Sequence, residues 1–182
     1  MQDPYAYLED LSSPATAHFA AEAHAETLAR FCADEAFAAL AADITAQLQD
    51  ERQIPFCQEH RGRMYHFYQN AQYPKGVYRV CSAASYRAGM PDWQVLFAVA
   101  DFDEVLGDDV YLDGVSHYVE APHQALLTLS SAGADAAYTV EFDLNAGAIV
   151  AGGFHFPAGK NHIAWRDENS VWVCPAWHEG QL

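Results

Sequence analysis

The chain has eight serines, a residue type that serves as the nucleophile in many hydrolases. None of them lies in the sequence pattern that such a nucleophile needs. In hydrolases with a nucleophile elbow, the serine lies on a sharp turn between a strand and a helix and is bordered by glycines, so that its hydroxyl projects beside an oxyanion hole. No G-x-S-x-G occurs in the 182 residues. The serines are Ser12 and Ser13 at a helix start, Ser130 and Ser131 in a turn, and Ser82, Ser85, Ser116 and Ser170 in or beside strands. A triad is defined by geometry, so assembly from unmatched residues stays an alternative. Nothing in the spacing favours it, and we predict no catalytic residue.

Nine histidines raise the possibility of a metal site. Their positions are His18, His24, His60, His66, His117, His123, His155, His162 and His178. None of them forms H-x-H, H-x-x-x-H or H-E-x-x-H, the spacings that place two imidazoles on one side of a strand or helix. We therefore expect scattered surface histidines and no metal ligand.

Two further segments resemble ligand sites only superficially. The stretch GGFHFPAGK at 152–160 is similar to a phosphate loop, but its second glycine comes one residue too late and Asn161 replaces the magnesium-binding Ser or Thr. The acidic run at 101–109 lacks the spacing and the glycine turn of a calcium loop. We expect a loop followed by a strand at the first segment, a solvated loop at the second, and no cofactor.

Charge limits the classes of partner. The chain carries 25 acidic and 9 basic residues, a formal charge of −16. Such a surface repels phosphates and anionic lipid, so nucleic acid and membranes are not expected as partners. Solubility is the simpler reading of the acidity, with cation binding as the alternative.

Neither the cysteine spacing nor any hydrophobic segment indicates secretion or insertion into a membrane. The N-terminal residues include Asp3, Glu9 and Asp10 where a signal peptide has basic and apolar residues, and no run approaches the ~20 apolar residues of a membrane span. We expect a cytoplasmic protein. The four cysteines are far apart and are expected to be free and mostly buried: Cys32, Cys57, Cys81 and Cys174.

The hydrophobic period changes once, near residue 53. Residues 1–52 are expected to form a helical segment, because Ser13 and Pro14 start a helix well, Asp34 can cap a second one, and an apolar stripe follows at spacings of three and four. The stripe consists of Phe37, Leu40, Ile44 and Leu48. We interpret it as packing surface.

Residues 53–182 show short runs with a period of two, separated by turn-forming residues. In SSAGADAAYTVEFDL at 130–144, the apolar residues Tyr138, Val140, Phe142 and Leu144 alternate with polar ones, as expected for one face of a strand. Other runs lie at 63–69, 77–82, 93–99, 110–119, 125–130, 162–165 and 171–174. No helix of 10–15 residues intervenes, so the strands are expected to form antiparallel hairpins. The spacing fits a sandwich or an incomplete propeller of about three blades at most.

Ordered sequence similarity distinguishes between these folds. The segment DPYAYLEDLSSPATAHFAAEAHAETL at 3–28 resembles the N-terminal signature of the prolyl oligopeptidase family of serine peptidases, and similar segments follow in order along nearly the whole chain. They are IPF at 54–56, MYHFYQNA at 64–71, GVYR at 76–79, SYRAGMPDWQVLFAVADF at 85–102, LLTLSSAGADAAYTVEFDL at 126–144 and FHFPAGKNHIAWRDENSVWV at 154–173.

This resemblance implies a mainly β chain with N-terminal helices, in which the meander forms two to three blades of a β-propeller. It also implies an N-terminal fragment: residues 1–52 would pack on a missing hydrolase domain, and the blades would restrict access to its active site. The intact enzyme would cleave short peptides after proline, whereas this chain alone is expected to be inactive and open to self-association through its incomplete propeller. The alternative is a stand-alone, non-catalytic β-sheet module that binds a partner.

Overall fold

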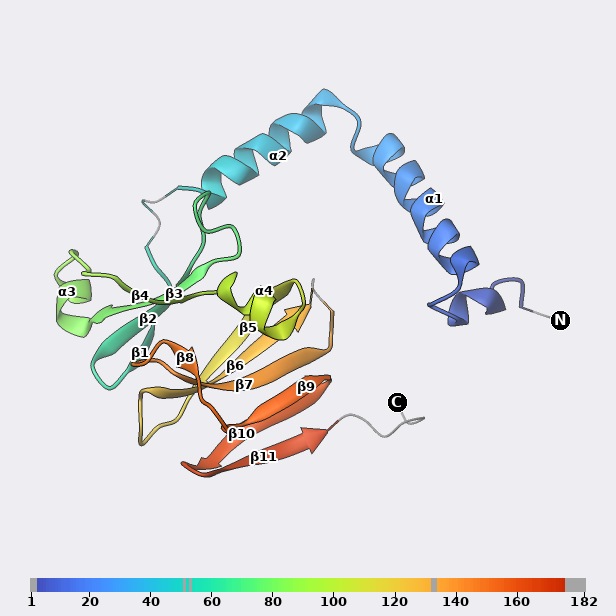
Figure 1. The fold of residues 1–182 in the computed structure, drawn as a ribbon. Coiled ribbons are helices and arrows are strands. Elements are labelled where there is room, and N and C mark those ends of the chain that lie inside the picture. Colours follow the sequence, from blue (N-terminus) through green and yellow to red (C-terminus); the bar gives the residue numbers. More distant parts are fainter. Residues whose placement is uncertain (1–2, 51, 53, 132–133, 176–182) are drawn as a thin grey trace. The chain divides into compact units, whose positions relative to one another are not determined.

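The chain divides into two compact units, Met1–Gln53 and Ile54–Leu182. The computed structural model describes residues 3–50, 52, 54–131 and 134–175 (Figure 1). The first unit is helical and the second consists mainly of antiparallel strands. The expected fold class, mainly β with N-terminal helices and antiparallel sheets, is confirmed. No helix in the described part of the chain combines the length and the apolar character that crossing a membrane requires.

The helical unit contains a short 3-10 helix η1 (Ala6–Glu9) and two α-helices, α1 (Pro14–Phe31) and α2 (Glu35–Leu48). The side chain of Ser13 caps α1 by accepting a hydrogen bond from the Thr16 amide at 3.1 Å. Asp34 caps α2 in the same way, accepting from the Phe37 amide at 2.7 Å. Both predicted helix starts are confirmed, and their side chains satisfy amide groups that have no partner within the helix.

Neither α-helix contains a buried residue. The predicted stripe on α2 is exposed along its length, from 44% at Phe37 to 73% at Leu48. Within the described residues of the helical unit, each helix therefore leaves an apolar face without cover. Most helical stability in proteins comes from packing of such a face, and these residues do not supply that packing by themselves.

The first sheet of the second unit has four strands in sequence order, all antiparallel. They are β1 (Gln58–His60), β2 (Arg63–Tyr68), β3 (Val77–Ser82) and β4 (Gln94–Ala98). A helical turn that the sequence did not predict, α3 (Ala83–Arg87), follows β3 and begins at Ser82, whose hydroxyl accepts from the Ser85 amide.

The second sheet has five antiparallel strands, in the order β5-β6-β7-β8 with β9 also paired to β7. They are β5 (Val110–His117), β6 (Gln124–Ser131), β7 (Ala137–Asp143), β8 (Ala148–Ile149) and β9 (His155–Gly159). A third, two-stranded sheet pairs β10 (Asn161–Asp167) with β11 (Ser170–Pro175). Two multi-stranded sheets and a hairpin match the expected two to three blades. Ser130 and Ser131, expected in a turn, instead belong to β6, and the rest of the predicted turn, residues 132–133, lies outside the described residues.

The core joins the first two sheets face to face. Every second residue of the central strands enters it, as the period of two requires. The first sheet contributes Tyr65, Tyr78, Val80 and Phe97, and the second contributes Val110, Ala125, Leu127, Leu129, Val140 and Phe142. The Phe97 ring packs edge-on against the Phe142 ring with centroids 5.0 Å apart. We call this face-to-face contact of the first two sheets the seam.

The other face of the second sheet contacts the third. The Trp165 side chain of β10 donates a hydrogen bond to the Ser116 carbonyl at 2.9 Å and packs against Tyr118, with ring centroids 5.3 Å apart. The polar face of β7 is buried as well: Glu141 is 6% exposed and its carboxylate accepts from the Phe154 amide. The second sheet is thus covered on both faces, as a blade between two neighbours is.

The acidic run at 101–109 is not a solvated loop, contrary to the sequence-based expectation. It forms the short helix α4 (Asp101–Leu106), which buries Phe102 and ends at Gly107 in the left-handed conformation. The ammonium group of Lys75 lies 2.6 Å from an Asp103 carboxylate oxygen and also pairs with Asp109. Burial disfavours the charge on Lys75, but these two hydrogen bonds outweigh it and raise the pKa of the amine.

The cysteines also differ from expectation in one respect. They are free, but only Cys81 is buried; Cys32 and Cys57 are partly exposed and Cys174 is exposed. Burial raises the pKa of the Cys57 and Cys81 thiols, which keeps them protonated and unreactive near neutral pH.

Gly76, between β2 and β3, offers a sharp test of this packing. Its φ is +91°, and a Cβ there would lie 2.3 Å from the Phe67 ring. Gly89 has a similar φ of +72° with no atom within 4 Å of a Cβ. Both Gly→Ala changes cost about 1 kcal/mol for the left-handed backbone, but G76A also displaces Phe67, adding about 1–3 kcal/mol. Urea unfolding of the two variants measures this difference, and equal losses would show that Phe67 does not pack as described.

Candidate functional site at the seam

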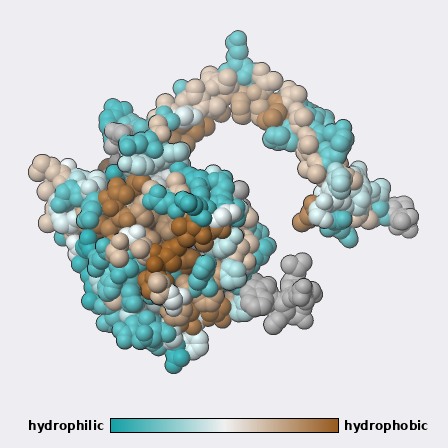
Figure 2. All heavy atoms as spheres, in the orientation of Figure 1, coloured by the Kyte–Doolittle hydropathy of each residue, from teal (hydrophilic) through white to brown (hydrophobic). Residues whose placement is uncertain are grey.

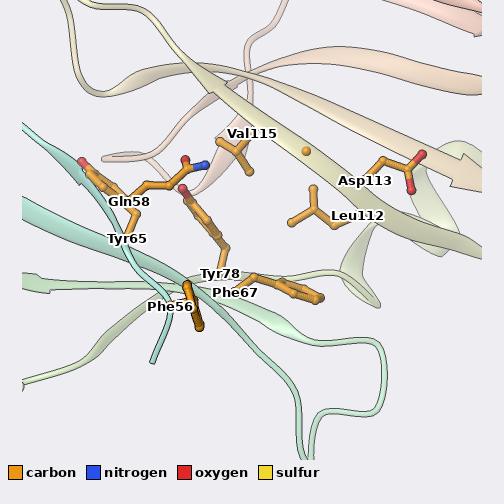
Figure 3. A pocket seen from close by; sticks show the side chains of 9 residues that line it. Phe56, Gln58, Tyr65, Phe67, Tyr78, Leu112, Asp113 and Val115 are labelled. Carbon is orange, nitrogen blue, oxygen red and sulfur yellow. The ribbon is translucent and has the colours of Figure 1, made fainter. Parts of the chain in front are cut away.

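A cavity of about 200 Å³ lies at the seam (Figure 3). The strands β1 and β2 with β3 form one wall, and β5 forms the other. Nine residues line it: Phe56, Gln58, Tyr65, Phe67, Tyr78, Leu112, Asp113, Gly114 and Val115. In Figure 3 the rings of Tyr78 and Phe67 and the side chains of Leu112 and Val115 extend into the space between the sheets. The lining combines aromatic and aliphatic side chains with the polar groups of Gln58 and Asp113, as the lining of small-molecule pockets does.

An irregularity in β5 opens this cavity. The pairing of β5 with β6 shifts register between Leu112 and Gly114, so Asp113 is an extra residue in the strand. Such a bulge bends the strand locally, and Gly114 then adds no side chain to the wall. The Asp113 carboxylate accepts a hydrogen bond from the Ser130 hydroxyl at 2.8 Å, so its charge is engaged within the second sheet.

Two histidines stack across the seam at one end of the cavity. His60, at the end of β1, and His117, at the end of β5, have ring centroids 5.2 Å apart and planes inclined by 24°. The Tyr65 ring lies 4.3 Å from the His117 ring. The Tyr78 hydroxyl and the Nε2 atom of His117 form a hydrogen bond of 2.9 Å. We call His60, Tyr65, Tyr78 and His117 the seam cluster.

Burial sets the protonation of this cluster. It lowers the pKa of His117 to about 4; the Pro122 backbone carbonyl opposes this shift, and His60 adds a smaller contribution in the same direction as burial. Burial also raises the pKa of the Tyr65 and Tyr78 phenols. Among the described residues, the Nε2 atom of His60 and the Nδ1 atom of His117 are buried without a hydrogen bond of normal geometry. His117 and the two phenols are therefore neutral at pH 7.

Seven of the eight serine hydroxyls form structural hydrogen bonds rather than a triad. Ser130 donates to Asp113 and Ser131 donates to Asp108 at 2.9 Å. Ser170 donates to Asp167, and Ser85, which lies in α3 rather than in or beside a strand, donates to Asp92. No serine hydroxyl in the described part of the chain hydrogen-bonds a histidine, so a nucleophile with an adjacent base is not formed there. The prediction of no catalytic residue stays a prediction.

A second polar cluster lies on the face of the first sheet that is turned away from the seam. The Arg79 guanidinium packs 3.8 Å from the centroid of Tyr68 and 4.4 Å from that of Trp93, and it donates to Nδ1 of His66 at 3.2 Å. Burial, with the charge of Arg79, lowers the pKa of His66 to about 4. His66 therefore accepts from Arg79 as a neutral imidazole.

The expectation of surface histidines is only partly met. His18, His24, His155 and His162 are exposed, whereas His60, His66, His117 and His123 are partly buried. His178 lies outside the described residues. The described residues contain no group of three or more His, Cys, Asp or Glu side chains that could hold a metal ion.

Sequence reasoning missed the seam cluster because its members are not near one another in the chain. His60 and His117 are 57 positions apart, on strands of different sheets. One signal was present: Tyr65 and Phe67 flank His66, and Tyr78 and Val80 flank Arg79, so each pair shares one face of a strand. Nothing in either run indicates which histidine lies opposite.

Comparison with known proteins finds matches that extend along nearly the whole chain. Residues 1–179 match the family model described as prolyl oligopeptidase, N-terminal beta-propeller domain. A post-proline cleaving enzyme from Rickettsia typhi has a similar structure, with a TM-score of 0.82 and 22% sequence identity over 96% of this chain and 26% of that one. At this identity the similarity concerns the fold alone.

Two curated sequences are similar along nearly the full chain. An uncharacterized peptidase of Sinorhizobium fredii is 28% identical over 99% of this chain, and an uncharacterized peptidase of Rickettsia prowazekii is 25% identical over 97%. This chain spans 25% and 26% of their respective lengths. The match thus covers the N-terminal propeller part of much longer peptidases.

The hydrogen bond between Tyr78 and His117 gives a test of the seam cluster. Y78F removes the hydroxyl and leaves Nε2 of His117 buried and unpaired, so we expect a loss of about 1–3 kcal/mol in the free energy of unfolding. Y111F is the control, because Tyr111 is 38% exposed on the outer part of β5, and it should change stability by less than about 0.5 kcal/mol. Urea denaturation at pH 7.5 measures both. Equal stability of Y78F and wild type would contradict this hydrogen bond.

Proposed function

We propose that this chain, which belongs to the prolyl oligopeptidase family through its N-terminal β-propeller domain, supplies blades that restrict access to the active site of a peptidase. The observation that carries the proposal is the family match over residues 1–179. The stacked antiparallel sheets of the second unit agree with it. In this role the chain contributes steric selection, while the catalytic groups belong to another domain.

Blades select substrates by geometry rather than by chemistry. Sheets packed face to face through a close-packed core do not part to admit a large polypeptide, folded or unfolded, without losing buried contacts. A short peptide needs a far smaller opening. We therefore infer that the substrates are short peptides and, from the family resemblance, that they are cleaved after proline.

The helical unit has a different role in this proposal. Both α-helices expose apolar side chains along their length (Figure 2). Fully burying one large apolar side chain is worth about 1.5–3 kcal/mol, so the stripe on α2 has much to gain from a partner surface. We infer that residues 1–52 form a docking segment for the peptidase domain and residues 53–182 form the blades.

Two expectations about this chain in isolation remain predictions. Self-association follows if its uncovered apolar faces pair with those of another copy, against the repulsion of a formal charge of −16. A cytoplasmic location also stays a prediction.

A chimera tests the proposed gate. In the Sinorhizobium fredii peptidase, the N-terminal part that this chain matches is replaced by residues 1–182. We expect the chimera to be labelled by a serine-reactive fluorophosphonate and to cleave a chromogenic prolyl peptide, but not a large unfolded protein, because the blades exclude it. The isolated chain should show neither labelling nor cleavage.

Variants of α2 test the docking segment in the same chimera. L40E/I44E places two charges in the apolar stripe, whereas A42E/A46E places them on the opposite helix face at the same spacing. We expect the first pair to reduce activity at least about tenfold, since each buried unpaired charge costs several kcal/mol, and the second to leave it within about twofold. Cleavage of the unfolded protein as fast as the short peptide would contradict the gate. Stoichiometric labelling of the isolated chain would instead assign it a nucleophile of its own, and a folded but inactive chimera would favour the stand-alone binding module.

A further inference from the structure

We propose that the seam is acid-labile, so that protonation of His117, which stacks on His60, parts the first two sheets reversibly at the end where these histidines lie. The property belongs to the β unit itself and does not depend on a peptidase domain. It adds a conformational response to a structure whose proposed role is to restrict access.

The position of the pair makes it a contact between the sheets. His60 ends β1 in the first sheet and His117 ends β5 in the second, and their rings stack at 5.2 Å. Tyr65 and Tyr78 of the first sheet also contact the His117 ring. One imidazole of the second sheet is thus held by three aromatic side chains of the first.

This contact is suited to neutral imidazoles. When neutral, His117 forms its hydrogen bond with the Tyr78 hydroxyl through Nε2. When protonated, both ring nitrogens carry a hydrogen. The Pro122 backbone carbonyl favours this charged form, but Nδ1 makes no hydrogen bond of normal geometry among the described residues. A buried charge that is not fully compensated is costly.

No carboxylate compensates for that charge. Arg63 lies over the Tyr65 ring, 6.0 Å from its centroid. Arg61, next to His60, pairs with Glu120 at 3.6 Å, and that pair is exposed. On β3 the facing group is the phenol of Tyr78, and on the loop after β5 it is the Pro122 carbonyl. None of the ion pairs in the described part of the chain includes His60 or His117.

The opposite end of the seam is held by ion pairs of Lys75, and the Asp103 carboxylate in them stays charged in mild acid. At the start of β5, Lys75 pairs with Asp103 and Asp109, and hydrogen bonding to Lys75 keeps the pKa of Asp103 below its usual value. The connection between the sheets, residues 99–109, also runs there. Opening is therefore expected at the histidine end, with the Lys75 end as the hinge.

The pH range follows from the difference in proton affinity between closed and open seams. Burial lowers the pKa of His117 from 6.5 to about 4. A lowered pKa in the closed state means that the open state binds the proton more tightly, so closure is fully favoured above pH 6.5 and weakens as the pH falls toward 4. This difference in the pKa of His117 limits the increase in the ratio of open to closed forms to ~300-fold as the pH falls through this range.

Hydrogen exchange of the full chain tests the proposal. Amide protection of β1 and of the His117 end of β5, corrected for the intrinsic pH dependence of exchange, should fall at least about tenfold between pH 7.5 and pH 4.5 in the wild type. H117Q keeps an acceptor for the Tyr78 hydroxyl but does not titrate, so the fall should shrink to less than about threefold. H60Q removes the stacked neighbour and should reduce the fall partially. H162Q, at an exposed histidine of β10, should behave like the wild type.

A titration of the wild type makes the test independent of whether the variants fold. Histidine Cε1–H resonances, followed by NMR from pH 7.5 to pH 4, should include one for His117 that stays neutral to below pH 5. An apparent pKa of His117 above 6 would overturn the proposal. So would an H117Q variant whose seam protection falls with pH as steeply as that of the wild type, or a fall of equal size at the centre of β6.

Discussion

The structure depends on the packing of one antiparallel sheet against the next. A sheet with apolar residues on both faces cannot bury them alone, and stacking is the arrangement that covers both. The second sheet shows this most clearly: Leu127 and Val140 face the first sheet, while Trp165 of the third sheet reaches the backbone of β5 on the other side. The face of the first sheet that carries Arg79 and Trp93 is the one turned away from the seam.

Features of the seam follow from the same packing. Two sheets that meet face to face leave space where a strand bends, and the bulge at Asp113 with the bare Gly114 creates the cavity there. The ends of the seam are polar, with histidines at one and the Lys75 ion pairs at the other. The apolar centre supplies the burial that stabilises the unit, and the ends determine how the contact responds to pH. The contact between the two sheets is therefore rigid at its centre and responds to pH at the histidine end.

The parts of this fold that depend on local sequence were predictable. Period-two runs such as 77–82 and 137–144 identified strands, because alternation places side chains on opposite faces whatever the partner strand is. Ser13 and Asp34 identified helix starts, because a cap bonds to amides within three residues. The family resemblance then selected a propeller where periodicity alone also allowed a sandwich.

What the sequence did not reveal depends on contacts between distant residues. Helix α4 forms where an acidic loop was expected because Phe102 enters the core and Lys75, 28 positions earlier than Asp103, neutralises its charge. In the sequence alone, His117 cannot be distinguished from a surface histidine, because its burial depends on β1 and β3 of the other sheet. The cavity likewise forms between strands of two different sheets, and the sequence of neither strand indicates that the other faces it.

The sequence encoded downstream of residue 182 tests the proposed gate most directly. If the chain supplies blades to a peptidase, the reading frame should continue with period-two runs that extend the sheet of β10 and β11, add further blades, and reach a serine bordered by glycines between a strand and a helix. Sequencing the DNA that follows measures this. A frame that continues into neither further blades nor such a serine would contradict the gate and assign the 182 residues to a binding module without a catalytic domain.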